Sequence, residues 1–373
     1  MAKSIIVDAP ETVHGPTRRR RRPIAAGLSA LTAICCAACE QKTPASPTAA
    51  SSNTAESTIA PGAIDASLEA AEHYLTAGNS ANAESIIVSL LAKVPQDHRA
   101  HELYGRVLYL RSFEASTGGD EAAAARHVAD AYEQYRLSVA GAETADGDPH
   151  MLAGLNQSAG EIASAAGQPD AALVHFRESG RLDPGAAKAP LYEAQILIQL
   201  GRSDEARQAL QRVLQLDPDE PYAHASLAAL AMRAADREAA VVHITEARRV
   251  DPRNLSFRLQ EARIRRESGD PRTALELLVA LDAGTRVEEA VTAEIAACYT
   301  SLDLPAKAAE AWEQRYRANT RHPTAWRAAV RAANARIKAG ERDRAVFLYH
   351  RAVLLAPDKP EVRALGKALQ ERQ

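Results

Sequence analysis

The sequence is poor in aromatic residues and in cysteine. Its 373 residues include two Trp, ten Tyr and four Phe, and three of its four cysteines stand together at positions 35, 36 and 39. So few aromatic side chains argue against a sandwich or barrel with an aromatic core. Alanine supplies much of the apolar fraction, and alanine is the strongest helix former. The composition therefore predicts helices that pack closely through small side chains.

Positive charge is scarce beyond the start of the chain. Residues 1–39 hold six of the 45 basic groups and two of the 48 acidic groups, so the remainder carries 39 basic and 46 acidic groups, a formal charge of −7. Affinity for nucleic acid depends on Lys and Arg that neutralise phosphates. The charge balance therefore predicts that no nucleic acid is bound.

Catalytic and metal-binding motifs are also missing. The sequence contains no His-Glu-x-x-His, no Gly-x-Ser-x-Gly and no glycine-rich phosphate or dinucleotide motif. His98 and His101 lie three positions apart without a suitably spaced acidic ligand, and Cys298 between Ala297 and Tyr299 is typical of a small buried side chain. We predict a protein that is not an enzyme, with no cofactor, no metal and no small-molecule substrate.

The segment 1–39 is typical of an export signal. Five arginines at positions 18–22 precede an apolar run that ends in small residues. A basic stretch, an apolar run of about 15 residues and a small-residue exit form the pattern of a secretory signal. The run is shorter than the ~20 residues of a membrane-spanning helix. Residues 1–39 are therefore predicted to direct export.

The end of this segment, Ala37-Ala38-Cys39, resembles the lipobox of bacterial lipoproteins. The resemblance implies that Cys39 is acylated and becomes the amino terminus. Cys36 stands where the lipobox usually has leucine, which makes Cys36 the alternative lipidation site. The resemblance also implies a membrane-anchored protein of the cell envelope on the periplasmic side, and Glu40 in place of aspartate points to the outer membrane. A plain cleaved signal and an uncleaved anchor are the two other interpretations.

Residues 40–62 contain many Pro, Ser, Thr and Ala residues and few large apolar ones. Such a composition cannot bury enough surface to offset the entropy of an ordered chain. We therefore expect a flexible tether over 40–62.

A regular period organises the remaining chain. Pro184, Pro218 and Pro252 are equally spaced, and each follows an aspartate. Glycine, alanine and a further small residue each recur at a fixed distance before such prolines; these are Gly78, Gly167, Gly201, Gly340, Ala83, Ala172, Ala206, Ala240, Ala345, Ala71, Gly160, Ala194, Ala228 and Ala333. This spacing predicts pairs of antiparallel helices, with glycine in the turn, small residues at the close contact and Asp-Pro at the end.

This pattern, with its period of about 34 residues, resembles the tetratricopeptide repeat. The resemblance covers residues 63–357. It implies an all-α, right-handed α-solenoid of about eight helix-turn-helix units, because single hairpins cannot bury their apolar faces and must stack. The unit over 96–149 is longer than the others, which predicts longer helices, a turn at Gly118-Gly119 and a closing loop over 141–148. Residues 358–373 are predicted to form a capping helix.

In the tetratricopeptide family the first helices of successive units line a groove that accepts a peptide or a partner helix. The positions that map to this groove are polar in the middle of the chain, as at Asn156, and rich in cations later: Arg263, Arg266, Arg327, Arg331, Asn334 and Lys338. Arginine forks suit carboxylates, so an acidic protein or peptide partner is expected. The alternative is that these arginines only pair with neighbouring glutamates.

The resemblance implies a non-catalytic scaffold for protein binding at the bacterial envelope. Pilus assembly, polysaccharide export and peptidoglycan remodelling are the processes that such proteins assist, and the sequence does not choose among them. An accessory or regulatory subunit of an envelope enzyme, such as a peptidoglycan hydrolase or a glycosyltransferase, is the alternative.

Overall fold

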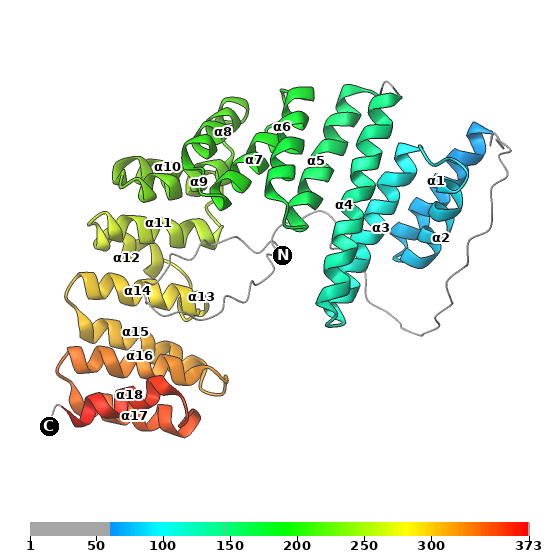
Figure 1. Ribbon diagram of the computed structural model, residues 1–373. Helices are drawn as coiled ribbons and strands as arrows, with labels where there is room; N and C mark the ends of the chain where they lie inside the picture. The colour runs from blue at the N-terminus through cyan, green and yellow to red at the C-terminus, as the bar shows by residue number, and fades with distance from the viewer. Residues whose placement is uncertain (1–59, 146, 372–373) are drawn as a thin grey trace. The chain divides into compact units, whose positions relative to one another are not determined.

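The computed structural model describes residues 60–145 and 147–371 (Figure 1). These residues form 18 helices and no strand, so the predicted all-α fold is confirmed. The predicted export signal with Cys36 and Cys39, and the tether as far as residue 59, lie outside the described residues. No helix in the described part of the chain is long and apolar enough to cross a membrane.

The helices belong to two compact units, which meet in sequence between Leu216 and Asp217. Unit 1 contains four helical hairpins: α1 (Pro61–Thr76) with α2 (Ser80–Leu91), α3 (His98–Thr117) with α4 (Glu121–Thr144), α5 (Pro149–Ala165) with α6 (Pro169–Leu182), and α7 (Lys188–Gln199) with α8 (Ser203–Leu216). Within the unit, the second helix of each hairpin contacts the first helix of the next. The hairpins are therefore stacked in chain order.

Unit 2 continues the same construction with one short additional helix. Its elements are α9 (Pro221–Arg233), α10 (Arg237–Val250), α11 (Leu255–Glu267), α12 (Pro271–Val279), α13 (Ala283–Arg286), α14 (Glu289–Ser301), α15 (Pro305–Ala318), α16 (Ala325–Lys338), α17 (Arg342–Leu355) and α18 (Pro360–Gln370). The one-turn helix α13 follows the point where Asp282 replaces the usual Asp-Pro ending, and the Asp282 carboxylate accepts a hydrogen bond from the backbone N–H of Thr285. Asp282 therefore starts a new turn instead of a loop.

Local sequence signals set the helix ends. Asp-Pro ends α6, α8 and α10 at Leu182, Leu216 and Val250, as the spacing predicted. Proline opens α6 and α12 at the first helical position. The turns of six hairpins place glycine at positive φ: Gly78, Gly119, Gly167, Gly201, Gly269 and Gly340. Ala235 (φ 59°) and Asp303 (φ 56°) occupy the equivalent turns without glycine. A left-handed conformation costs a residue with a Cβ about 1–2 kcal/mol, so the packing of these two hairpins must offset that strain.

The predicted small residues lie where the helices of a hairpin approach most closely. A Cβ atom on Gly160 of α5 would lie 2.7 Å from Cε1 of Phe176 on α6, so only glycine fits beneath this ring. The corresponding alanines of later hairpins, Ala194, Ala228, Ala262 and Ala333, have no exposed surface. Small residues in the first helix therefore make room for large side chains of the second helix.

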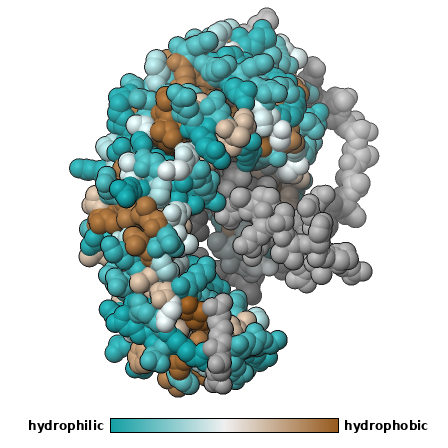
Figure 2. Space-filling view, turned by 90° about the vertical axis from the view of Figure 1, so that its left-hand side faces the viewer, coloured by the Kyte–Doolittle hydropathy of each residue, from teal (hydrophilic) through white to brown (hydrophobic). Residues whose placement is uncertain are grey.

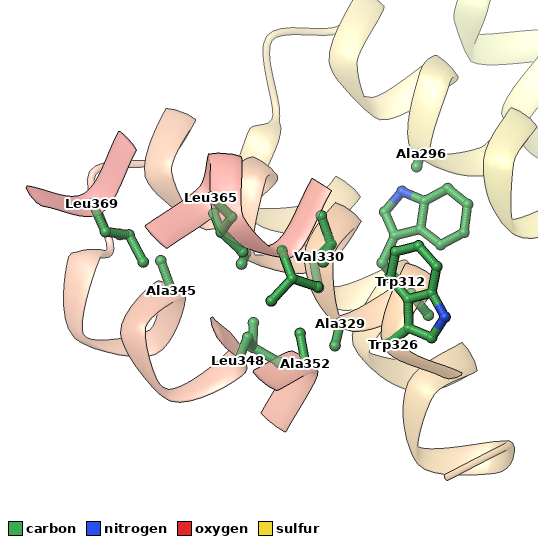
Figure 3. Packing of buried hydrophobic residues seen from close by; sticks show 14 of the residues in the cluster. Ala296, Trp312, Trp326, Ala329, Val330, Ala345, Leu348, Ala352, Leu365 and Leu369 are labelled. Atoms are coloured by element: carbon green, nitrogen blue, oxygen red, sulfur yellow. The ribbon is translucent and has the colours of Figure 1, made fainter. Parts of the chain in front are cut away.

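The last hairpins of unit 2 share a continuous hydrophobic core. Trp312 and Trp326 lie at one end of this cluster and Leu369 at the other (Figure 3). Helix α18 buries Val362, Leu365 and Leu369, and Gly366 lies against the Tyr349 ring of α17. Helix α18 therefore covers an apolar surface that α16 and α17 would otherwise expose.

The second hairpin of unit 1 contains the two longest helices of the described chain, 20 residues in α3 and 24 in α4. The turn between them lies at Gly118-Gly119. The predicted loop over 141–148 is shorter than expected, because α4 continues to Thr144. Gly141 is helical, and a Cβ there would lie 3.0 Å from the Gln96 carbonyl oxygen. This glycine therefore allows α4 to pass close to the start of α3.

Three buried glutamates each bind two arginines. Glu193, Glu261 and Glu313 have 4%, 0% and 8% of their surface exposed. Their partners are Arg177 and Arg212 for Glu193, Arg248 and Arg265 for Glu261, and Arg336 and Arg317 for Glu313. A buried charge that loses its partner costs about 3–5 kcal/mol. The ion pairs of these six arginines with buried glutamates therefore form part of the fold itself.

We expect Gly160→Ala to lower the free energy of unfolding by about 1–3 kcal/mol, because the added methyl group would force the Phe176 ring to move. Gly154 on the same helix is the matched control, since nothing lies within 4 Å of a Cβ there. Gly154→Ala should raise stability by about 0.5–1 kcal/mol through helix propensity alone. Urea unfolding followed by circular dichroism measures both changes. Equal effects of the two substitutions would contradict the close contact.

Candidate functional site

The predicted groove residues lie on first helices of unit 2. Arg263 and Arg266 are in the last turns of α11, and Arg327, Arg331, Asn334 and Lys338 follow one another along α16. The four α16 residues are spaced by about one helical turn, so they share one face of that helix. Helix α14 contacts α11, and Glu289 of α14 binds Arg331 of α16. The six residues therefore lie on two first helices, α11 and α16, with α14 between them in the stack.

The two arginines of α11 have carboxylate partners. Arg266 Nε donates a hydrogen bond of 2.5 Å to Oε1 of Glu294 on α14. Arg263 Nε donates to Oε1 of Glu267, one turn later on α11, at 3.2 Å. The guanidinium of Arg266 is mostly covered, whereas Arg263 is half exposed. Here the structure shows the pairing with neighbouring glutamates that the sequence left open.

On α16 the arginines lie over tryptophan rings. The guanidinium carbon of Arg331 is 4.6 Å from the centre of the Trp312 ring, and that of Arg327 is 5.5 Å from the Trp326 ring. Both tryptophans are buried in the core shown in Figure 3. Cation–π contacts of this kind contribute about 0.5–2 kcal/mol. The buried rings therefore hold two exposed guanidinium groups in place at the surface.

The remaining charges decide which groups on α16 are available to a partner. Arg331 Nη1 donates to Oε1 of Glu289 at 3.3 Å, and Glu289 also accepts from Arg315 at 3.1 Å. Arg327 and Lys338 have no ion pair with any residue that the structure describes. Within that part of the chain, Arg266 of α11 and Arg331 of α16 bind different glutamates of α14, Glu294 and Glu289. The free positive charge is on α16.

Asn156 does not belong to the groove. The structure buries it to 2% exposure on α5, where its side-chain amide donates to the Leu152 carbonyl oxygen and its side-chain oxygen accepts from the His175 ring of α6. The expectation that it faces the groove is therefore wrong. The reason is physical: the amide satisfies its hydrogen bonds inside the hairpin, so it can be buried at little cost.

The first-helix face of unit 1 carries an aromatic pair that sequence reasoning missed. Tyr109 and Phe113 of α3 pack edge to face with ring centres 5.1 Å apart, and Phe113 is 46% exposed. Burial raises the pKa of Glu102 on α3 and of Glu161 on α5. The pair was missed because the extra length of this hairpin interrupts the regular spacing of the repeats. Two aromatic residues at helical spacing were the signal that could have identified this surface. Unit 1 thus presents aromatic and acidic groups, whereas unit 2 presents arginines.

The side chains on these surfaces can bind a partner through ion pairs, hydrogen bonds and stacking. Among residues 60–145 and 147–371 there is no group of three or more His, Cys, Asp and Glu side chains arranged for a metal ion. Cys298 of α14 has no exposed surface, and burial, together with the negative charge of Glu294, raises the pKa of its thiol to about 12. Cys298 is therefore present as the protonated thiol, which is unreactive.

The raised pKa predicts slow modification of Cys298. A pKa of about 12 instead of the ordinary 9.0 lowers the thiolate fraction at pH 8 by about a thousandfold. Iodoacetamide should therefore label Cys298 at least about a thousandfold more slowly in the native protein than in urea. Peptide mapping by mass spectrometry measures the rate at this residue. Equal rates in the two states would contradict the buried position.

Residues 163–230 match the family model described as tetratricopeptide repeat. This segment runs from the end of α5 into α9 and includes two of the glycine turns. No curated protein matches the sequence.

Several solved structures resemble the chain. The C-terminal part of a tetratricopeptide repeat-containing protein from Cytophaga hutchinsonii is 11% identical, with a TM-score of 0.49, and the alignment covers 80% of this chain and 98% of that one. A tetratricopeptide repeat protein from Parabacteroides merdae is 16% identical, with a TM-score of 0.46 and coverage of 72% and 99%. The pilF product of Pseudomonas aeruginosa is 18% identical, with a TM-score of 0.45 and coverage of 62% and 96%.

The matched segment shares its construction with the hairpins before and after it. Left-handed turns recur at Gly78, Gly167, Gly201, Gly269 and Gly340, and fully buried alanines recur at the close contacts of the helices. Residues 163–230 therefore resemble the tetratricopeptide repeat in sequence, and the hairpins before and after them repeat the same construction.

Proposed function

We propose that this protein is a non-catalytic scaffold that binds an acidic protein or peptide segment on the first-helix face of unit 2. Tetratricopeptide domains bind protein or peptide partners. The observation that supports the acidic partner is the pair Arg327 and Arg331, two exposed guanidinium groups one helical turn apart over buried tryptophan rings. A partner carboxylate can bind such a fork through two hydrogen bonds.

The two arginines would contribute differently. Arg327 has no carboxylate partner among the described residues and is available directly. Arg331 already binds Glu289 at 3.3 Å, so a partner carboxylate would share or displace that bond. Because the tryptophan rings already restrict both side chains, less conformational entropy is lost when a partner binds. The exposed charges would also steer an acidic segment toward this face.

We further propose that the scaffold is anchored at the bacterial envelope through an acylated Cys39. The support comes from the sequence of residues 1–39, with its arginine run, apolar stretch and lipobox-like ending. Each buried CH₂ of an acyl chain contributes about 0.8 kcal/mol to membrane binding, so two or three chains would hold the protein at a membrane surface. Pilus assembly, polysaccharide export and peptidoglycan remodelling are the candidate processes.

The double substitution Arg327→Glu with Arg331→Glu tests the partner site. It should reduce the partners recovered by crosslinking in the native host by about tenfold or more, because two cations become anions. Arg181→Glu with Arg207→Glu is the charge-matched control, since these arginines lie in unit 1 on exposed surface. Quantitative mass spectrometry of the crosslinked material provides the measurement.

Unchanged recovery with the first variant, or equal losses with both variants, would remove the α16 site from the proposal. Thermal unfolding of both variants shows whether the fold is intact. Recovery of an envelope enzyme in fixed stoichiometry, with altered activity when this protein is deleted, would favour the accessory-subunit alternative.

Lipidation predicts a separate result. Cys39→Ser should abolish incorporation of a labelled fatty acid and move the protein from the membrane to the soluble fraction, whereas Cys36→Ser should leave both unchanged. The mass of the mature amino-terminal peptide measures the modification directly. The reverse result would assign the site to Cys36, and no label in the unsubstituted protein would exclude the acyl anchor.

A further inference from the structure

An open groove of about 810 Å³ lies between α15 and α17, the second helices of the last two hairpins. It shares no lining residue with the α16 face described above. Its size is within the range of sites that enclose a compact ligand or several side chains of a peptide. The groove is therefore a separate place for a partner on unit 2.

The wall that α17 provides is unusually apolar for a helix surface. Phe347, Leu354 and Leu355 line the groove with 56%, 76% and 44% of their surface exposed. The adjacent Leu348 points into the core shown in Figure 3 and is 4% exposed. A surface helix normally presents polar residues to water. On a surface that is mostly hydrophilic in the view of Figure 2, adjacent exposed apolar side chains indicate a binding surface.

Arginines surround this apolar wall. Arg317, Arg344 and Arg351 all line the groove, and the guanidinium carbon of Arg351 lies 5.1 Å from the centre of the Phe347 ring. Glu313 is the one carboxylate among the lining residues, and it already binds Arg317 at 2.9 Å and Arg336 at 2.7 Å.

The positive charge of the groove is therefore only partly neutralised. Arg344 binds Glu341 at 3.3 Å but keeps 61% of its side chain exposed. Arg351 has no ion pair within the part of the chain that the structure describes. An occupant must cover apolar side chains and supply negative charge at the same time. A basic or a wholly polar segment meets only part of this requirement.

We propose that the α15–α17 groove is a second docking site, whose occupant is an acidic amphipathic helix of a partner protein. Its apolar face covers Phe347 and Leu354, and its carboxylates bind Arg344 and Arg351. A helix that lays its apolar face into a groove is a general mode of peptide recognition. The site works independently of the α16 face, so one molecule can hold two partners and bring them together.

The hollowed form of the surface favours a protein segment over a membrane. A bilayer is engaged by side chains that protrude, whereas here the apolar residues form the wall of a groove between two helices. Anionic lipid would still satisfy the charges. Binding to vesicles therefore serves as the competing outcome in the experiment.

The experiment uses the full chain and a fluorescent synthetic helix with leucines at i, i+3, i+4 and i+7 and glutamates elsewhere. Fluorescence anisotropy should show binding about tenfold tighter than that of a scrambled peptide of the same composition. Leu354→Glu and, separately, Arg351→Glu should each weaken binding about tenfold, because each removes one half of the recognition. Val242→Glu is the control, because it introduces the same charge at an exposed apolar position of α10, and it should leave peptide binding unchanged.

Two further measurements separate the possible results. Because the acidic peptide can also bind the α16 face, the titration is repeated in the Arg327→Glu with Arg331→Glu background, where Leu354→Glu should still weaken the remaining binding about tenfold; failure of the α16 proposal and failure of the groove proposal are then distinguishable. Equal affinity for the scrambled peptide, or full binding by the Leu354→Glu variant, overturns the groove. Vesicles of anionic phospholipid that bind in a Leu354-dependent way without any peptide binding would also overturn it, in favour of a lipid surface.

Discussion

The contact between a small residue on the first helix of a hairpin and a large side chain on the second is the constraint on which the rest of the structure depends. At Gly160 the Phe176 ring leaves no space for a Cβ, and Ala194, Ala228 and Ala262 remain fully buried at the corresponding contacts. The close approach of the two helices gives each hairpin its thickness. Stacking of the hairpins then sets their first helices side by side, which creates the surfaces on which α14 and α16 present their charges.

Arginine has different roles in this protein, and burial separates them. Arg336, with 1% of its surface exposed, binds Glu313 and Glu341 and belongs to the core of the last hairpins. Arg266 crosslinks α11 to α14 through Glu294. Arg327 instead lies over the buried Trp326 ring and Arg351 over the exposed Phe347 ring, and neither has a carboxylate partner among the described residues. The first kind stabilises the stack, and the second kind is available for binding.

The two faces of unit 2 differ in the recognition they allow. On α16 the charges lie over rings that are themselves buried, so recognition there is mainly polar. In the α15–α17 groove the apolar side chains are themselves exposed, so the groove combines apolar burial with charge. The two proposed sites would distinguish acidic partners by the apolar content of their binding segments.

The sequence by itself determined the local features of this protein, because they depend on neighbouring residues. Asp-Pro pairs ended the predicted helices at Leu182, Leu216 and Val250, and the regular spacing of the repeats identified the hairpins and their small contact residues. The candidate arginines of α16 were also found from their one-turn spacing, because helical geometry places them on one face.

Only the tertiary structure decided the features that depend on packing between distant segments. The turns at Ala235 and Asp303 lack the glycine that marks the others, and Asn156 is buried because His175 of the next helix satisfies it. Arg331 meets Glu289, 42 positions away, and the α15–α17 groove exists only once two hairpins are stacked. Helix ends follow from short-range steric and hydrogen-bonding rules, whereas the partners of a charged side chain follow from the rotation and separation of whole hairpins, which no short stretch of sequence encodes.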